Sequence, residues 1–187
     1  MILEKLKKCL KSEKRDNIFD IVIFGSLVKG SLEPRDVDVM VVFSEGSLKE
    51  RLDTVQEIKN RLKGKIDEII DIKQCLLKDL FSLEFMARTG ILIEGISVFH
   101  NKKFCQTLGF ESYTIFWYNL RNLSHTQKVQ FNYILAGRNQ KGVIEQLRGK
   151  RLANGVIKIP IEYSLEFEDI LKQNKINYNK KSVLEEM

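Results

Sequence analysis

The stretch "FGSLVKGSLEPRDVDVMVVF", residues 24–43, joins two apolar segments through a loop rich in glycine and serine. The first segment, "IFDIVIFG" at 18–25, is β-branched and aromatic and stops at a glycine, as a buried strand does. The second segment, "DVDVMVVF" at 36–43, has the same character but opens with two carboxylates, Asp36 and Asp38. Two like charges at the edge of a core repel each other. This placement therefore predicts that the two carboxylates bind a ligand.

Successive side chains of a strand point to opposite faces, so Asp36 and Asp38 are expected on one face, about 6.5–7 Å apart at Cα. Val37 and Val39 then point to the other face. Carboxylates are ligands that Mg²⁺ prefers, and two such ions about 3.5–4 Å apart serve in-line phosphoryl transfer. The spacing therefore indicates a site for divalent cations.

Gly25 and Ser26 follow the first strand directly. Glycine lets the backbone approach phosphate oxygens without a Cβ in the way, and serine adds a hydroxyl and an amide N–H. Lys29, close by in sequence, adds a positive charge. These three residues are interpreted as a phosphate cradle that precedes the cation site.

The remaining elements of the first half predict a mixed α/β (α+β) sheet with helices mainly on one face. A second helix begins at Ser47, where Glu50 completes a capping box, and stops at Gly64. The other expected elements are a helix at 2–14, a strand at 65–72, a helix at 75–88, and short strands at 91–95 and 97–100.

The chain changes character near residue 107, which predicts one domain at 1–107 and a smaller basic unit at 108–187. Helices are expected at 112–123, 124–137 and 140–149, and Asn154-Gly155 is the dipeptide preferred in a hairpin turn. Helix, turn, helix, hairpin is the order of a winged helix, a likeness in pattern.

Positive charge gathers in the second unit. Between Trp117 and Lys158 there are eight Lys or Arg residues against one acid, Glu145, while the whole chain has a net charge of +6. Such asymmetry favours a polyanionic or acidic partner for the segment 117–158, such as RNA or DNA. No apolar run approaches the roughly 18 residues of a membrane span, and the charged N-terminus lacks a signal-peptide core, so a soluble, cytoplasmic protein without a membrane partner is expected.

The pattern "FGSLVKG" followed by "DVDV" resembles the signature of the DNA polymerase β-like nucleotidyltransferase superfamily, and the short chain is similar to its minimal members. The resemblance covers about residues 1–100. It implies that Gly25 and Ser26 bind a nucleoside triphosphate, and that Asp36 and Asp38 ligate two Mg²⁺ ions, for which Mn²⁺ can substitute. It also implies a third carboxylate on the next strand that joins a metal and helps to deprotonate the acceptor.

The segment "KIDEIID" offers three candidates for that carboxylate, Asp67, Glu68 and Asp71. With Asp67 toward the site, Ile66, Ile70 and Ile72 go to the core, only Glu68 is misplaced, and Asp71 also faces the site. Choosing Glu68 would send two acids toward the helices, which is costlier. Asp67 is the predicted third ligand and Asp71 is next.

The leading hypothesis is a Mg²⁺-dependent nucleotidyltransferase that moves a nucleoside monophosphate, with AMP favoured, from a triphosphate to a hydroxyl of a nucleic acid or a protein. Pyrophosphate is released. The alternative is a binding module with weak or no turnover, either the antitoxin of a toxin–antitoxin pair or a nucleic-acid-binding protein. Some minimal members of the superfamily are antitoxins that add AMP to a partner toxin, so the two readings overlap.

Overall fold

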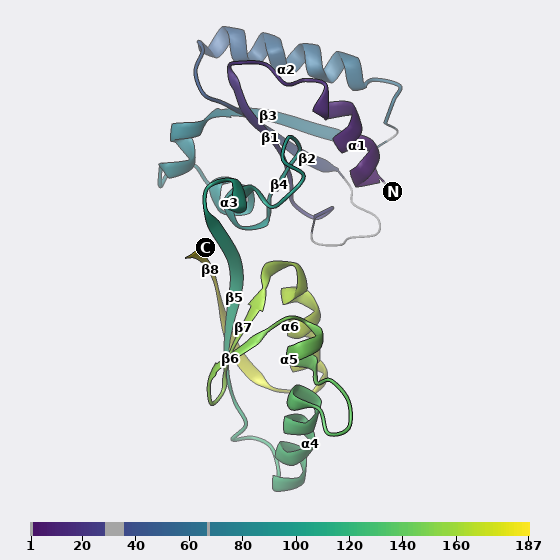
Figure 1. The fold of residues 1–187 in the computed structure, drawn as a ribbon, viewed down its shortest axis with the longest axis vertical. Helices are drawn as coiled ribbons and strands as arrows, with labels where there is room; N and C mark the ends of the chain where they lie inside the picture. The colour runs from purple at the N-terminus through teal and green to yellow at the C-terminus, as the bar shows by residue number, and fades with distance from the viewer. Residues whose placement is uncertain (1, 29–35, 67) are drawn as a thin grey trace. The chain divides into compact units, whose positions relative to one another are not determined.

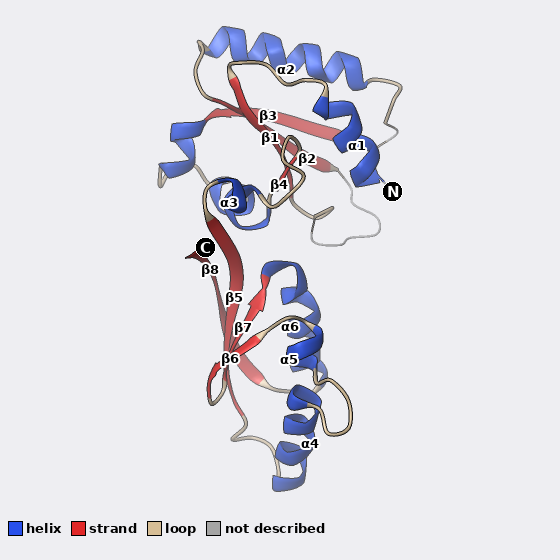
Figure 2. Cartoon of the chain, in the orientation of Figure 1, coloured by secondary structure: helices blue, strands red, loops and turns tan. Residues whose placement is uncertain are grey.

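The computed structural model describes residues 2–28, 36–66 and 68–187. The chain divides into two compact units, Met1–Gly109 and Phe110–Met187. Each unit has its own four-stranded sheet (Figures 1 and 2). Within the described residues, no helix is long and apolar enough to cross a lipid bilayer.

The N-terminal unit is built on a mixed sheet with the spatial order β3-β2-β1-β4. β2 runs antiparallel to β1 and parallel to β3, and β4 runs antiparallel to β1. The mixed sheet predicted from the sequence is thereby confirmed. Its strands are β1 Ile18–Phe24, β2 Val37–Phe43, β3 Ile70–Leu76 and β4 Ile96–Ser97.

Two helices, α1 (Ile2–Lys11) and α2 (Leu48–Leu62), cover one face of this sheet. α2 begins as predicted, because the Ser47 hydroxyl accepts from the Glu50 amide at 3.3 Å and the Glu50 carboxylate accepts from the Ser47 amide at 2.7 Å. A cap of this kind stabilises a helix by about 1 kcal/mol. The core between helices and sheet contains Leu6, Leu10, Ile21, Ile23, Val39, Val41, Val55, Ile58 and Ile72 among others.

The opposite face of the sheet is covered by shorter elements. They are a 3₁₀ helix at Leu77–Phe81, a π-helical turn at Gly90–Glu94 and α3 at Phe104–Thr107. Leu80, Ile91 and Phe104 from these elements pack on the side chains of the central strands. The longer helices therefore lie on one face, as the sequence predicts.

The third strand and the helix after it differ from expectation. The strand predicted at 65–72 is found at Ile70–Leu76, where every residue pairs with one of β2. The helix predicted at 75–88 is wrong, because its first residues belong to this strand. After Leu76 only a 3₁₀ turn forms, and the Asp79 carboxylate accepts from the Leu76 amide at 2.8 Å to start it. Pairing with a buried strand outweighs local helix propensity here.

The short strand expected at 91–95 is also wrong, since Gly90–Glu94 forms a π-helical turn. A Cβ on Gly95 would lie 2.3 Å from the Ile91 carbonyl oxygen, so glycine permits the tight return of the backbone after this turn. Of the strand expected at 97–100, only Ser97 forms a ladder with β1, together with Ile96 before it.

The C-terminal unit is built on an antiparallel sheet with the order β6-β7-β5-β8. Its strands are β5 Phe110–Asn119, β6 Lys150–Ala153, β7 Val156–Pro160 and β8 Asn177–Glu186. Its helices are α4 His125–Ala136, α5 Val143–Gln146 and α6 Ser164–Gln173. Phe116, Phe131, Ile157, Phe167 and Leu171 are buried in the core between them.

The helix predicted at 112–123 is wrong, because residues 110–119 form β5. Alternate residues of this segment are buried, among them Ser112, Thr114 and Phe116, which is the period of a strand. The unit thus begins with a strand where the winged-helix order requires a helix. The hairpin is confirmed, with its turn at Asn154-Gly155 and Gly155 at φ +74°.

Candidate active site

Gly25 lies at the end of β1, where the backbone adopts φ +82°. A Cβ added to Gly25 would lie 2.3 Å from Oδ2 of Asp38. The two residues approach because Phe24, the last residue of β1, pairs with Asp38 of β2. Gly25 is therefore required for two reasons, the positive φ and the close approach of the Asp38 carboxylate. Ser26 follows in an exposed turn.

Asp38 lies on the face of β2 opposite to the helices. Val37, Val39 and Val41 are fully buried against the helical side, while Asp38 is half-buried on the other side. Asp36 is exposed and directly precedes the strand. The alternation expected from the sequence thus holds for the residues of the strand itself.

Asp71 of β3 is the direct neighbour of Asp38 in the parallel register. Its carboxylate is ion-paired with the Lys73 ammonium at 2.8 Å, and their side chains are 40% and 58% exposed. One residue, Ile72, lies between them along the strand, so both side chains lie on the face of Asp38. This face, called the carboxylate face below, therefore has carboxylates from two adjacent strands and the ammonium group of Lys73.

Electrostatics on this face favour the neutral form of Asp38. Burial raises the pKa of Asp38, the charges of Asp36 and Asp71 raise it further, and Lys73 opposes them. The pKa of Lys73 is raised, first by its hydrogen bond to Asp71. Excess negative charge is thus present around Asp38, and a cation would relieve it.

The donor set matches the preference of Mg²⁺ for carboxylate oxygens. In the described part of the chain, no three His, Cys, Asp or Glu side chains are arranged as a complete metal-binding group. The Lys73 ammonium engages the Asp71 carboxylate instead. By donor type, Asp36, Asp38 and Asp71 are the residues here that could hold a divalent cation, and the register places Asp38 and Asp71 on one face.

Two predicted site residues, Lys29 and Asp67, lie outside the described residues. Glu68 lines a hollow beside α2 together with Lys59 and Leu62, which places it on the helical side of the sheet. Of the two candidates that the structure describes, Glu68 and Asp71, the register of β3 brings Asp71 next to Asp38.

Lys73 is a further member of this face and is not among the residues predicted from the sequence. The signal is present in "DIK", because a lysine two residues after a site-facing acid on a strand shares its face. It is visible only once the strand is known to extend to Leu76 instead of ending at 72.

A family model described as Polymerase beta, Nucleotidyltransferase matches residues 4–103. The chain belongs to this family. The resemblance read from the glycine-serine pair and the Asp-x-Asp spacing is thereby confirmed, and the matched residues hold the whole carboxylate face of this nucleotidyltransferase domain.

No curated protein matches the chain. One solved structure, a crystal structure of a toxin–antitoxin with AMP-PNP, is 19% identical over 52% of this chain and 73% of its own, with a TM-score of 0.36. A likeness of this size carries no argument about the substrate or partner of the nucleotidyltransferase.

Proposed function

We propose that the protein is a Mg²⁺-dependent nucleotidyltransferase of the cytoplasm. It transfers a nucleoside monophosphate, with AMP favoured, from a triphosphate to a hydroxyl of a nucleic acid or protein and releases pyrophosphate. The observation that carries the proposal is the carboxylate face, with Asp38 held over Gly25 and beside Asp71 in a chain of this family.

The end of β1 is proposed to bind the triphosphate. Gly25 leaves room for the close approach of backbone and carboxylate, and Ser26 offers a hydroxyl and an amide in an exposed turn. Lys29 stays the predicted source of a further positive charge. This arrangement would place the phosphates beside the carboxylates.

Asp36, Asp38 and Asp71 are proposed to hold the divalent cations. When bound, these ions neutralise the charge that develops on the attacking and leaving oxygens. Asp67 stays the sequence-based prediction for the third ligand. Asp71 is preferred here because it is the neighbour of Asp38 in the register of β2 and β3.

In the proposed step, the acceptor oxygen forms a bond to the α-phosphorus. The bond from that phosphorus to the oxygen bridging to the β-phosphate breaks, and the electron pair leaves with pyrophosphate. Asp71 is proposed to accept the proton of the acceptor hydroxyl, after its ion pair with Lys73 opens. The gain in rate comes mainly from positioning and electrostatic stabilisation.

The test is a transfer assay with each α-labelled triphosphate, Mg²⁺ or Mn²⁺, and separate pools of RNA, DNA and protein. Wild type should label one pool, and Asp36→Asn and Asp38→Asn should not. Glu84→Gln removes an exposed acid elsewhere in the same unit and should leave labelling unchanged. Absence of transfer and of metal-dependent nucleotide binding in the wild type would refute the proposal.

A further inference from the structure

The two faces of the sheet in the C-terminal unit are covered differently. Figure 1 shows α4, α5 and α6 on the same side of this sheet. Phe116 of β5 points to them and is fully buried with Phe167, at 5.0 Å between ring centroids. Trp117, the next residue, points to the other face. Within residues 110–187, all of which are described, no helix covers that face, which is called the open face below.

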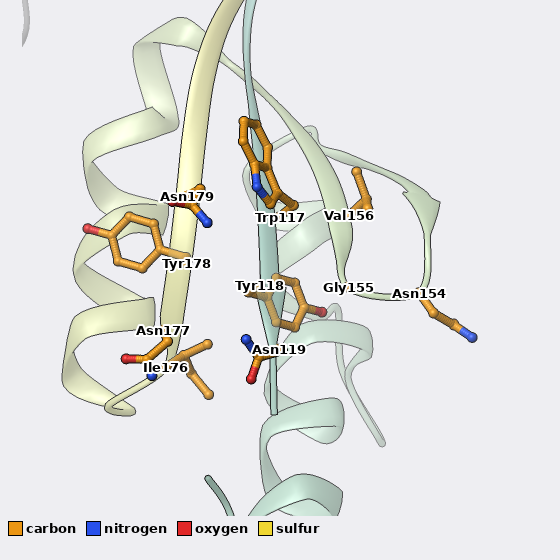
Figure 3. A pocket seen from close by; sticks show the side chains of 10 residues that line it. All are labelled: Trp117, Tyr118, Asn119, Asn154, Gly155, Val156, Ile176, Asn177, Tyr178 and Asn179. Atoms are coloured by element: carbon orange, nitrogen blue, oxygen red, sulfur yellow. The ribbon is translucent and has the colours of Figure 1, made fainter. Parts of the chain in front are cut away.

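A pocket of about 760 Å³ lies at one end of the sheet, where β5 and β8 meet the turn of the β6–β7 hairpin. Figure 3 shows its side chains along these neighbouring strands, with Trp117 and Asn119 on β5. The ring of Tyr178 is directed away to α6, where its hydroxyl donates to Glu168 at 2.6 Å. The lining residues are Trp117, Tyr118, Asn119, Asn154, Gly155, Val156, Ile176, Asn177, Tyr178 and Asn179.

Trp117 presents its indole to solvent at this pocket, with 41% of the residue exposed. Its direct partners in the sheet are Val156 on one side and Asn179 on the other, and neither carries a large side chain. A large exposed aromatic ring is costly in water, and it is well suited to stack on a flat ligand.

Four asparagines line the same pocket as the indole, and none of the lining side chains is charged. The side chains of Asn154, Asn177 and Asn179 are exposed and have no hydrogen-bond partner among the described residues. Asn119 accepts from the Arg121 amide at 3.3 Å. A carboxamide both donates and accepts, which matches the mixed pattern on the edge of an unstacked nucleobase.

Lysines lie beside the pocket on the same open face. The register places Lys150 beside Lys158, and Lys158 and Lys181 on either side of Ile115. Lys158 is engaged, since its ammonium lies 4.3 Å from the Tyr113 ring centroid and pairs with Glu185. Lys150 and Lys181 are exposed. The unit as a whole has twelve Lys and Arg against eight Asp and Glu.

We propose that the open face binds single-stranded nucleic acid. One base stacks on Trp117, asparagines of the pocket contact the edges of the bound bases, and Lys150 and Lys181 contact neighbouring phosphates. A sugar ring would also suit an indole with amides, but the lysines on the same face favour a polyanion. A duplex does not offer the face of a base to the indole. The inference rests on the proposed function only in making this strand the acceptor, because the binding itself needs no catalysis.

Trp117 is the single tryptophan of the chain, so its intrinsic fluorescence reports on this pocket alone. The experiment uses the full-length Asp38→Asn variant in EDTA, which separates binding from transfer. Four ligands are titrated in parallel: a single strand of RNA and one of DNA, each of about twelve nucleotides, a duplex of equal length and a neutral oligosaccharide. Single strands of RNA, DNA or both should quench the fluorescence to saturation, and affinity should fall as salt rises.

Variants then assign the contacts by the anisotropy of a labelled strand. Trp117→Ala should weaken binding roughly tenfold, and Trp117→Phe should keep most of the affinity. The matched control is Tyr133→Ala, an exposed aromatic on α4 away from the open face, which should change affinity less than twofold. Replacing Lys150 and Lys181 by Gln should reduce the salt slope by about 1.4, or roughly 0.7 per lost phosphate contact.

Three results would overturn the proposal. The first is the absence of binding by either kind of single strand. The second is equal binding of the duplex without quenching, which would mean contact with the backbone alone. The third is quenching by the oligosaccharide and by none of the nucleic acids. None of these results depends on whether the wild type transfers nucleotides, so the proposed function and this inference can fail separately.

Discussion

The carboxylate face of the N-terminal unit and the open face of the C-terminal unit are both made by alternate residues of a strand whose other residues fill a core. On the first, Asp38 and Asp71 bring like charges together beside buried valines. On the second, Trp117 and Asn179 bring an aromatic ring and a neutral amide together. The first face costs stability until a cation binds, whereas the Trp117–Asn179 pair of the second carries no like-charge repulsion. One is suited to metal-dependent chemistry and the other to recognition.

The largest expected effect comes from removing the charge of the Asp38 carboxylate. Asp38→Asn should lower the rate of label transfer by roughly a thousandfold, because it removes a proposed metal ligand. It should also raise the melting temperature in EDTA. Burial and like charges raise the pKa of Asp38, so the ionised carboxylate destabilises the folded state at neutral pH. Transfer within tenfold of wild type, or a lower melting temperature, would show that this face is not built around that charge.

A smaller effect is expected where the carboxylate meets the backbone. Gly25→Ala places a Cβ 2.3 Å from Asp38 Oδ2 at φ +82° and should reduce both stability and transfer. Gly64→Ala is the matched control, because φ is +73° and nothing lies within 4 Å of the new Cβ. Both should lose about 1–2 kcal/mol from backbone strain, measured by denaturant unfolding. Only Gly25→Ala should lose transfer, and equal activity of the two variants would argue against the contact.

Glu168 of α6 forms a network with Lys180 and Tyr178 of β8, on the side of the sheet opposite to the open face. Burial raises the pKa of Glu168, but hydrogen bonds from Lys180 and Tyr178 outweigh it and lower the pKa to about 2. Because the unfolded value is near 4.5, this stabilisation is present above about pH 4.5 and is lost as the pH falls toward 2. Glu168→Gln should therefore cost roughly 2 kcal/mol at pH 7 and much less at pH 3.

The fluorescence of Trp117 measures this unfolding, since the single tryptophan lies in the C-terminal unit. Glu166→Gln, an exposed acid on the same helix, should change little at either pH. An equal loss for Glu168→Gln at pH 7 and pH 3 would mean that the network does not depend on its charge.

The smallest effect is expected at Lys73. Its pair with Asp71 is largely exposed, so Lys73→Met should change stability by less than about 0.5 kcal/mol. It should lower the Mg²⁺ concentration needed for nucleotide binding several-fold, because Asp71 no longer has a competing cation. Lys78→Met, at another exposed lysine, is the control in the same Mg²⁺ titration. A higher Mg²⁺ requirement would instead mean that Lys73 assists binding.

The central elements of the N-terminal fold could be predicted because their signals are local. The apolar strands at 18–24 and 37–43 and the capping box of α2 depend on neighbours in sequence. The segment at 75–88 could not be predicted, since its first residues are held by pairing with β2. At 112–123 an apolar and aromatic run suits either state, and pairing along β8 decides for a strand. Such long-range pairing is not visible in local patterns.

The residues of the candidate site also divide into those predictable from local sequence and those that depend on strand pairing. Asp36 and Asp38 could be proposed from spacing alone, because alternation on one strand is local. The choice of Asp71 depends on the register between two strands, and a shift of one residue would exchange it with its neighbours. For the same reason Lys73 was missed. Trp117 and Phe116 are adjacent aromatics in the sequence, and only the sheet distinguishes the exposed Trp117 from the buried Phe116.

The most direct test compares the two acids proposed for the third position. Initial rates of transfer from the preferred α-labelled triphosphate are measured side by side for wild type, Asp71→Asn and Asp67→Asn at saturating Mg²⁺. Wild type and Asp67→Asn should transfer label at similar rates, and Asp71→Asn should lose at least a hundredfold. Loss with Asp67→Asn but not with Asp71→Asn, or no transfer by the wild type with any triphosphate, would contradict the account.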